Sequence, residues 1–105
     1  MGFFDFFKVP DINQGVTEFL ETSGAILLDV RTPQEHRAGH IPKSRNLPLQ
    51  SLDKAGSVID NKDTPIFVYC HSGSRSRQAA DMLARMGYRS VKNIGGIASY
   101  GGKVV

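Results

Sequence analysis

The sequence predicts an α/β fold, a three-layer α/β/α sandwich around a central, mostly parallel sheet of about five strands. Two observations favour this fold. Residues 25–30 and 66–69 are short apolar runs, typical of strands that are buried on both faces. Stretches with helical periodicity alternate with these runs, and this alternation is typical of parallel sheets that helices cover.

In the first half of the chain, turn and capping residues separate the expected elements. These elements are a short edge strand at 9–12, a helix at 13–22, a strand at 25–30, a short helix from 33 and a strand at 45–47. Gly24 ends the first helix. Thr32 and Glu35 have the spacing of a capping box, and Pro33 between them occupies the first helical position. Gly39 stops this short helix.

The second half of the chain contains the strongest helical pattern. The expected elements are a weak helix from 48 to 58 or 59, a strand at 66–69, a helix at 76–86, a strand at 89–93 and a Gly-hinged turn at 94–100. In the helix at 76–86, Ala79, Leu83 and Met86 fall on one face. Gly87 then ends that helix.

The composition is that of one soluble globular domain. We expect a Phe-rich N-terminal segment at 1–8 and a single domain at 9–105. The rings of the segment either pack onto the domain, which we favour, or dock onto a partner or a membrane surface. No stretch is long and apolar enough to cross a bilayer and no secretory signal is evident, so we expect a cytoplasmic protein.

Cysteine count and charge exclude several classes of site. The only cysteine, Cys70, rules out an intrachain disulfide and a paired-cysteine metal site. The net charge of +3 comes from scattered lysines and arginines, so nothing indicates a nucleic-acid surface. His36 and His40 are spaced to share a metal, but no third ligand is evident and we interpret them as surface residues. We expect no metal and no cofactor.

Cys70 lies where a buried strand passes into a helix. The backbone N–H groups at such a junction lack helical partners and point into the loop. A thiol placed there has a depressed pKa, and its thiolate is a nucleophile. Gly73 allows a positive φ, and Arg75 offers a cation for an anionic substrate. The predicted substrate-binding residues are His71, Ser72, Gly73, Ser74, Arg75 and Ser76.

Two of these assignments have alternatives. Cys70 in a purely structural role would be a core cysteine, but a core cysteine does not require Gly and Arg at fixed offsets behind it. His71 either adds positive charge at mildly acid pH or simply faces the solvent.

A second group of polar residues ends the other buried strand. If the two strands are parallel, Asp29 and Arg31 share one sheet edge with Cys70. Asp29 either orients the Cys70 loop by accepting its N–H groups or pairs with Arg31. Arg31 and Glu35 are alternatively only a structural pair.

These residues resemble the rhodanese family of single-domain sulfurtransferases over residues 9–100. The resemblance rests on five motifs in a fixed order. They are Leu28-Asp29-Val30-Arg31 with Glu35, Gly39-His40-Ile41-Pro42, Asn46-Leu47-Pro48, Val68-Tyr69-Cys70 with the loop through Arg75, and Asn93-Ile94-Gly95-Gly96-Ile97. Each motif is weak alone, but the ordered set is highly specific.

The resemblance implies a sulfurtransferase that works through a persulfide on Cys70. A small anionic donor such as thiosulfate would supply the sulfur, and a thiol or a protein would accept it. The amides from His71 to Ser76 would hold the terminal sulfur. The cationic Arg75 and a protonated His71 favour thiosulfate over mercaptopyruvate as the donor.

Two other functions compete with this one. Phosphatases and arsenate reductases of the same fold carry Cys-x5-Arg, whereas Cys70 and Arg75 form the shorter Cys-x4-Arg. The smaller loop suits a single sulfur atom better than a tetrahedral oxyanion. A non-catalytic docking module is the third hypothesis, against which the presence of Cys70 and Arg75 argues.

Overall fold

The predicted α/β sandwich is confirmed, with all strands of its sheet parallel. The computed structural model describes residues 10–105, so the Phe-rich segment lies outside the described residues. The strands are β1 (Ile26–Asp29), β2 (Arg45–Asn46), β3 (Ile66–Cys70) and β4 (Val91–Gly96). They form a sheet in the order β2-β1-β3-β4. No helix in residues 10–105 is long and apolar enough to span a membrane.

The sheet has four strands in the described part of the chain. The prediction of a fifth strand at residues 9–12 was wrong. The carboxylate of Asp11 accepts the backbone N–H of Asn13 at 3.0 Å, and this N-cap starts helix α1 (Ile12–Glu21). Ile12 is therefore helical, because a side-chain cap at Asp11 competes locally with strand pairing. Val9 lies outside the described residues.

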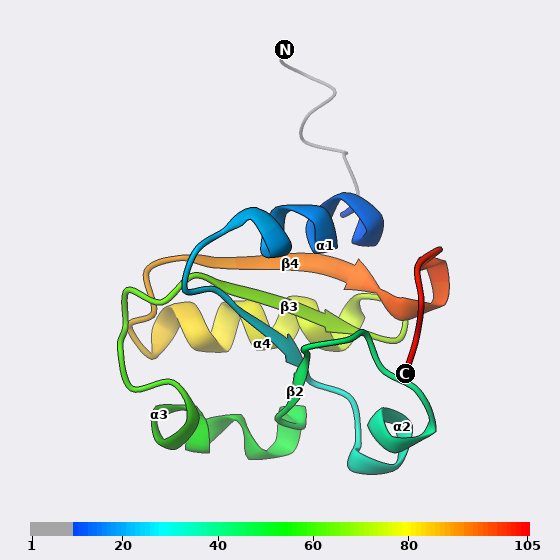
Figure 1. The fold of residues 1–105 in the computed structure, drawn as a ribbon. Helices are drawn as coiled ribbons and strands as arrows, with labels where there is room; N and C mark the ends of the chain where they lie inside the picture. Colours follow the sequence, from blue (N-terminus) through cyan, green and yellow to red (C-terminus); the bar gives the residue numbers. More distant parts are fainter. Residues whose placement is uncertain (1–9) are drawn as a thin grey trace, which may run out of the picture.

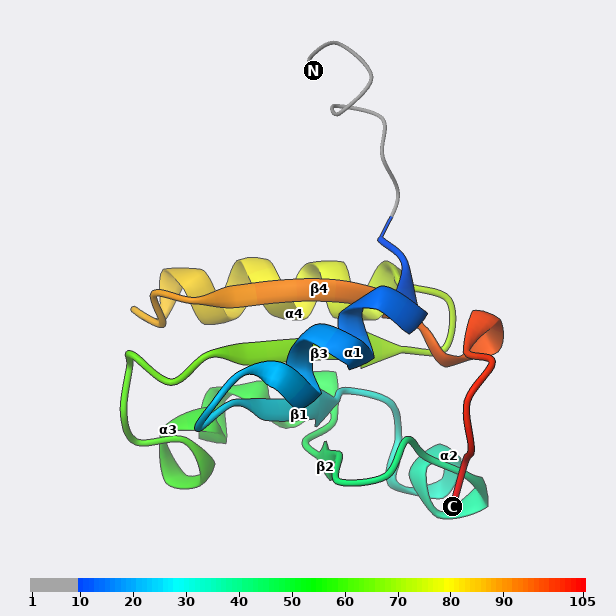
Figure 2. The ribbon, with the colours of Figure 1, turned by 45° about the horizontal axis from the view of Figure 1, so that its top comes forward.

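Helices cover both faces of the sheet (Figures 1 and 2). On one side α1 packs over Leu27, Phe67 and Tyr69. On the other side lie α4 (Ser74–Arg85), the 3-10 helix η2 (Leu49–Lys54) and α3 (Ala55–Val58), packed over Leu28 and Val68. The alternating side chains of β3 thus reach both cores, which explains its uninterrupted apolar sequence.

The capping box at Thr32 and Glu35 forms as predicted and starts α2 (Pro33–Ala38), which ends at Gly39. Helix α4 begins two residues earlier than the predicted 76–86. Gly73 is its N-cap, with φ of +106°, and this left-handed turn leads the chain directly into helix at Ser74. The connection from β3 to α4 is therefore residues 71–73, which we call the reactive loop.

The end of β4 contacts the reactive loop. The pairing of β3 with β4 skips Ile94, so that Asn93 and Gly95 are opposite consecutive residues of β3. This bulge has Gly95 at φ of +104°. A Cβ on Gly96 would lie 2.6 Å from the Cα of Ser72, so only glycine allows the loop to approach β4 so closely. The predicted turn at 94–100 thus begins as strand and ends as the 3-10 helix η3 (Ile97–Ser99).

Candidate functional site

Cys70 ends β3 and is fully buried beneath the reactive loop. Burial by itself is typical of a structural cysteine. The surroundings of this sulfur are polar, however. The backbone N–H of Gly73 lies 2.9 Å from Sγ, and the hydroxyl oxygen of Ser76 lies 3.4 Å from it. The positive φ of Gly73 turns that N–H inward.

These donors favour the thiolate of Cys70. Burial raises the pKa of the thiol, but the Ser76 hydroxyl and the backbone N–H groups of Ser76, Gly73 and Ser72 outweigh burial and hold that pKa below its ordinary value. The stabilisation comes from neutral hydrogen-bond donors at the start of α4. The hydrogen bonds that lower this pKa thus come from a side-chain hydroxyl and backbone N–H groups.

β4 and η3 hold the reactive loop from the side. The N–H of Ala98 donates to the carbonyl oxygen of His71 at 3.0 Å. The hydroxyl oxygen of Ser76, which has no exposed surface, lies 3.0 Å from Gly73 O and 2.7 Å from Asn93 Oδ1. Both ends of the loop are thus bonded to groups outside it.

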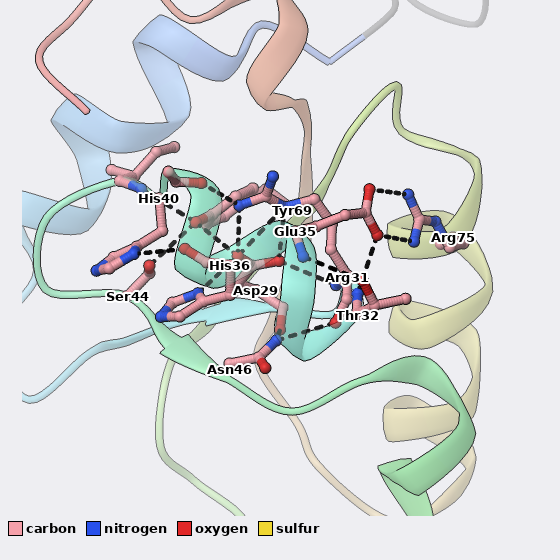
Figure 3. A network of polar contacts seen from close by, with 12 residues as sticks. Asp29, Arg31, Thr32, Glu35, His36, His40, Ser44, Asn46, Tyr69 and Arg75 are labelled. Atoms are coloured by element: carbon pink, nitrogen blue, oxygen red, sulfur yellow. Dashed lines mark hydrogen bonds and ion pairs between the residues drawn. The ribbon is translucent and has the colours of Figure 1, made fainter. Parts of the chain in front are cut away.

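Arg75 is brought to the site, but its charge is matched within the chain. It lies in the first turn of α4, and its guanidinium donates to Glu35 of α2 at 2.7 and 3.0 Å (Figure 3). The hydrogen bonds from Arg75 lower the pKa of Glu35 to about 2. The same carboxylate accepts the backbone N–H of Thr32 at 3.0 Å. This pairing weakens the argument that Arg75 selects a doubly charged donor.

The other predicted substrate-binding residues lie on the outer side of the reactive loop. His71, Ser72 and Ser74 are exposed. With Gly73, they line an open groove of about 1100 Å³ between the N-terminal parts of α1 and α4. Cys70 is not among the residues that line this groove. The exposed part of the loop therefore lines this groove, whereas the buried sulfur does not.

Asp29 and Arg31 lie at the same end of the sheet as Cys70. Of the two roles predicted for Asp29, the structure shows the ion pair with Arg31 and not a bond to the Cys70 loop. Its buried carboxylate accepts from Arg31 at 2.8 Å, from His36 at 2.8 Å and from the hydroxyl of Tyr69 at 3.1 Å (Figure 3). Burial raises its pKa, but the hydrogen bonds from Arg31 and His36 outweigh burial and lower it. Within residues 10–105, no hydrogen bond joins the Asp29 carboxylate to the reactive loop.

Sequence reasoning missed the roles of Tyr69 and Asn93. The Tyr69 hydroxyl also accepts the N–H of Ile41 at 3.1 Å and bonds Ser44 at 3.0 Å, so it holds the segment after α2 beneath the sheet edge. A tyrosine inside a buried apolar strand was the available signal, because its hydroxyl needs a partner there. Nothing local indicated that Asn93 faces Ser76 from β4.

The two histidines pack against each other. The rings of His36 and His40 stack with centroids 3.8 Å apart, and His36 is held by Asp29. In the described residues no group of three or more His, Cys, Asp or Glu side chains gathers as metal ligands do. Nδ1 of His36 bonds Asp29 and Nδ1 of His40 bonds the carbonyl oxygen of His36, each at 2.8 Å, which favours a structural role for this pair.

Comparison with known proteins agrees with this geometry. The Rhodanese-like domain model matches residues 13–103. Thiosulfate sulfurtransferase PspE of Escherichia coli is 34% identical over 71 residues, which are 67% of this chain and 68% of that protein. Uncharacterized protein YqhL of Bacillus subtilis is 40% identical over 81 residues, 76% of this chain and 64% of that protein.

A solved structure described as a rhodanese with anions from E. coli has the same fold. It aligns with a TM-score of 0.72 and 30% identity, over 77% of this chain and 96% of that one. The predicted resemblance is confirmed, since one family model covers nearly all the described residues and the ordered motifs meet at one sheet edge. This chain belongs to the rhodanese-like domain family.

Proposed function

We propose that this protein is a thiosulfate sulfurtransferase that carries sulfur as a persulfide on Cys70. The observation that supports it best is the sulfur at the start of α4, with the Gly73 N–H at 2.9 Å and the Ser76 hydroxyl at 3.4 Å. Relatives that carry the name thiosulfate sulfurtransferase support the choice of reaction. The cytoplasmic location and the acceptor stay predictions.

In the proposed first step, the Cys70 thiolate attacks the outer sulfur of thiosulfate. The S–S bond of the donor breaks, sulfite leaves with the bonding electron pair, and Cys70 becomes a persulfide anion. In the second step an acceptor thiolate attacks the terminal sulfur, and the Cys70 thiolate is regenerated. Because Cys70 is the only cysteine, the accepting thiol belongs to another molecule.

The reactive loop has to move for this reaction. Cys70 is fully buried, so thiosulfate reaches its sulfur only when the cover over it opens locally, and the exposed reactive loop is the part of that cover we propose to open. His71 and Ser72 are exposed, so their displacement costs little buried area. The N–H groups that now face Sγ then surround the second sulfur in the same way.

Intact-mass spectrometry after mixing with thiosulfate tests the proposal. We expect a gain of one sulfur atom, which reducing agent removes and which Cys70→Ser does not acquire. Hydrolysis of an aryl phosphate without this gain would instead support the phosphatase alternative. A protein inert in both assays would support a docking module, and either result rejects the proposed function.

A further inference from the structure

The hydroxyl of Ser76 is surrounded by hydrogen-bond acceptors. Its oxygen lies 2.7 Å from Asn93 Oδ1, 3.0 Å from Gly73 O and 3.5 Å from Gly95 O, and 3.4 Å from the sulfur of Cys70. Ser76 is fully buried, so water does not replace these partners. A hydroxyl has one proton to donate. The sulfur and the oxygens therefore compete for that proton.

Asn93 presents an oxygen, not an amide nitrogen, to Ser76. The same side-chain atom accepts the backbone N–H of Gly95 at 3.0 Å, and a backbone N–H only donates. Gly95 follows Asn93 by two residues and has the positive φ of the bulge in β4, and its N–H bonds back to the Asn93 side chain. When the Ser76 hydroxyl donates to another acceptor, Asn93 Oδ1 therefore still accepts the N–H of Gly95.

The two protonation states of Cys70 use this arrangement differently. As a thiol, the sulfur donates its proton to the Ser76 oxygen, and Ser76 donates to Asn93. As an anion, the sulfur has no proton, and the Ser76 hydroxyl turns to donate to it. Asn93 then keeps only the N–H of Gly95.

We propose that Asn93 is a positioning residue for sulfur transfer, which holds the Ser76 hydroxyl beside Cys70 and receives its hydrogen bond whenever the sulfur is protonated. The inference rests on the proposed sulfurtransferase function and deepens it. Asn93 acts only on the protonated state, because its bond to Gly95 is the same in both states. It therefore sets the pH at which the sulfur becomes reactive.

Asn93→Leu tests the proposal, since leucine keeps the volume and removes the acceptor. In the thiol form the Ser76 proton then has only the longer contacts to Gly73 O and Gly95 O, so the pH midpoint of Cys70 alkylation by iodoacetamide should fall, by at most roughly one unit, the worth of one hydrogen bond. The acid limb of sulfur transfer from thiosulfate should shift equally. In a Ser76→Ala background, the same change should leave the midpoint where Ser76→Ala alone puts it.

Asn61→Leu is the matched control. Asn61 Oδ1 likewise accepts the N–H of the residue two positions on, Asp63 at 2.8 Å, but in an exposed turn before β3. This variant should keep the parent midpoint. If Asn93→Leu folds poorly, Asn93→Asp keeps the shape and both hydrogen bonds, and its stronger, charged acceptor should raise the midpoint.

Other charged groups near the sulfur stay constant across these variants. They are Arg75 of α4 with Glu35 of α2, the Asp29–Arg31 pair of β1, and His71 of the reactive loop. An unchanged midpoint in Asn93→Leu, or an equal shift without the Ser76 hydroxyl, overturns the role of Asn93. Alkylation needs no donor, so failure of the parent protein to take sulfur from thiosulfate rejects the proposed function separately.

Discussion

A single methyl group at Gly96 should disable the reactive loop. A Cβ there would lie 2.6 Å from the Cα of Ser72 and closer still to the carbonyl oxygen of His71. Both neighbours are backbone atoms, which cannot turn aside as the tip of a side chain does. Since carbon atoms pack at about 3.5–4.0 Å, Gly96→Ala displaces the loop by about 1 Å.

That displacement disrupts the contacts that define the site. The N–H of Gly73 is 2.9 Å from Sγ, and an added 1 Å or so stretches this bond to the limit for a sulfur acceptor and weakens it. The bond from Ala98 to His71, 3.0 Å long, is lost. We expect a stability loss of about 1–3 kcal/mol from overpacking and about a hundredfold fall in kcat/KM for sulfur transfer.

Thiocyanate formation from thiosulfate and cyanide measures the rate, and denaturant unfolding measures the stability. Gly56→Ala is the control, because a Cβ on Gly56 in α3 has no heavy atom within 4 Å. It should leave the rate unchanged and stabilise the protein by up to about 1 kcal/mol. The reasoning is refuted if Gly96→Ala transfers sulfur at the parent rate while its Cys70 reacts with iodoacetamide as in the parent.

Three further substitutions test the network around the site. Glu35 has its pKa lowered to about 2 by Arg75, so the pair stabilises the fold above the ordinary pKa of 4.5 and this contribution is lost as the pH falls toward 2. Glu35→Gln should lower the free energy of unfolding by at most about 1 kcal/mol at neutral pH, because the pair is partly exposed. In denaturant titrations below pH 4.5, the variant should lose less stability with falling pH than the parent protein. Asp29→Asn leaves Arg31, its buried partner, without a carboxylate. The free energy of unfolding should fall by about 3–5 kcal/mol in the same titrations, and a fall of less than about 1 kcal/mol would contradict a buried ion pair. Gly15→Ala puts a Cβ 2.5 Å from the side chain of Ile94 in β4, so α1 has to shift. Stability in thermal unfolding should fall by about 1–3 kcal/mol, and an unchanged Tm would contradict this packing.

Local patterns in the sequence were sufficient to predict most of the elements. The capping box at Thr32 and Glu35, the apolar run of β3 and the helical period of α4 are signals carried by neighbouring residues, and the structure contains each element. The placement of Cys70 between a strand and a helix follows from the same local reasoning. The prediction of an edge strand at 9–12 was wrong. It relied on a short apolar pattern and overlooked Asp11, whose side chain caps the helix that starts at Ile12.

The tertiary structure alone decided which side chains meet around the sulfur. Arg75 pairs with Glu35 across forty residues, and Gly96 admits the backbone of His71 from a different strand. Asn93 reaches Ser76 from β4, a strand that follows α4 in the chain. Such contacts depend on how parallel strands align and how closely their backbones approach. Neither is encoded in the spacing of residues along one segment. The sequence by itself therefore determined that Cys70 lies between a strand and a helix, and the packing of the sheet determined which side chains surround it.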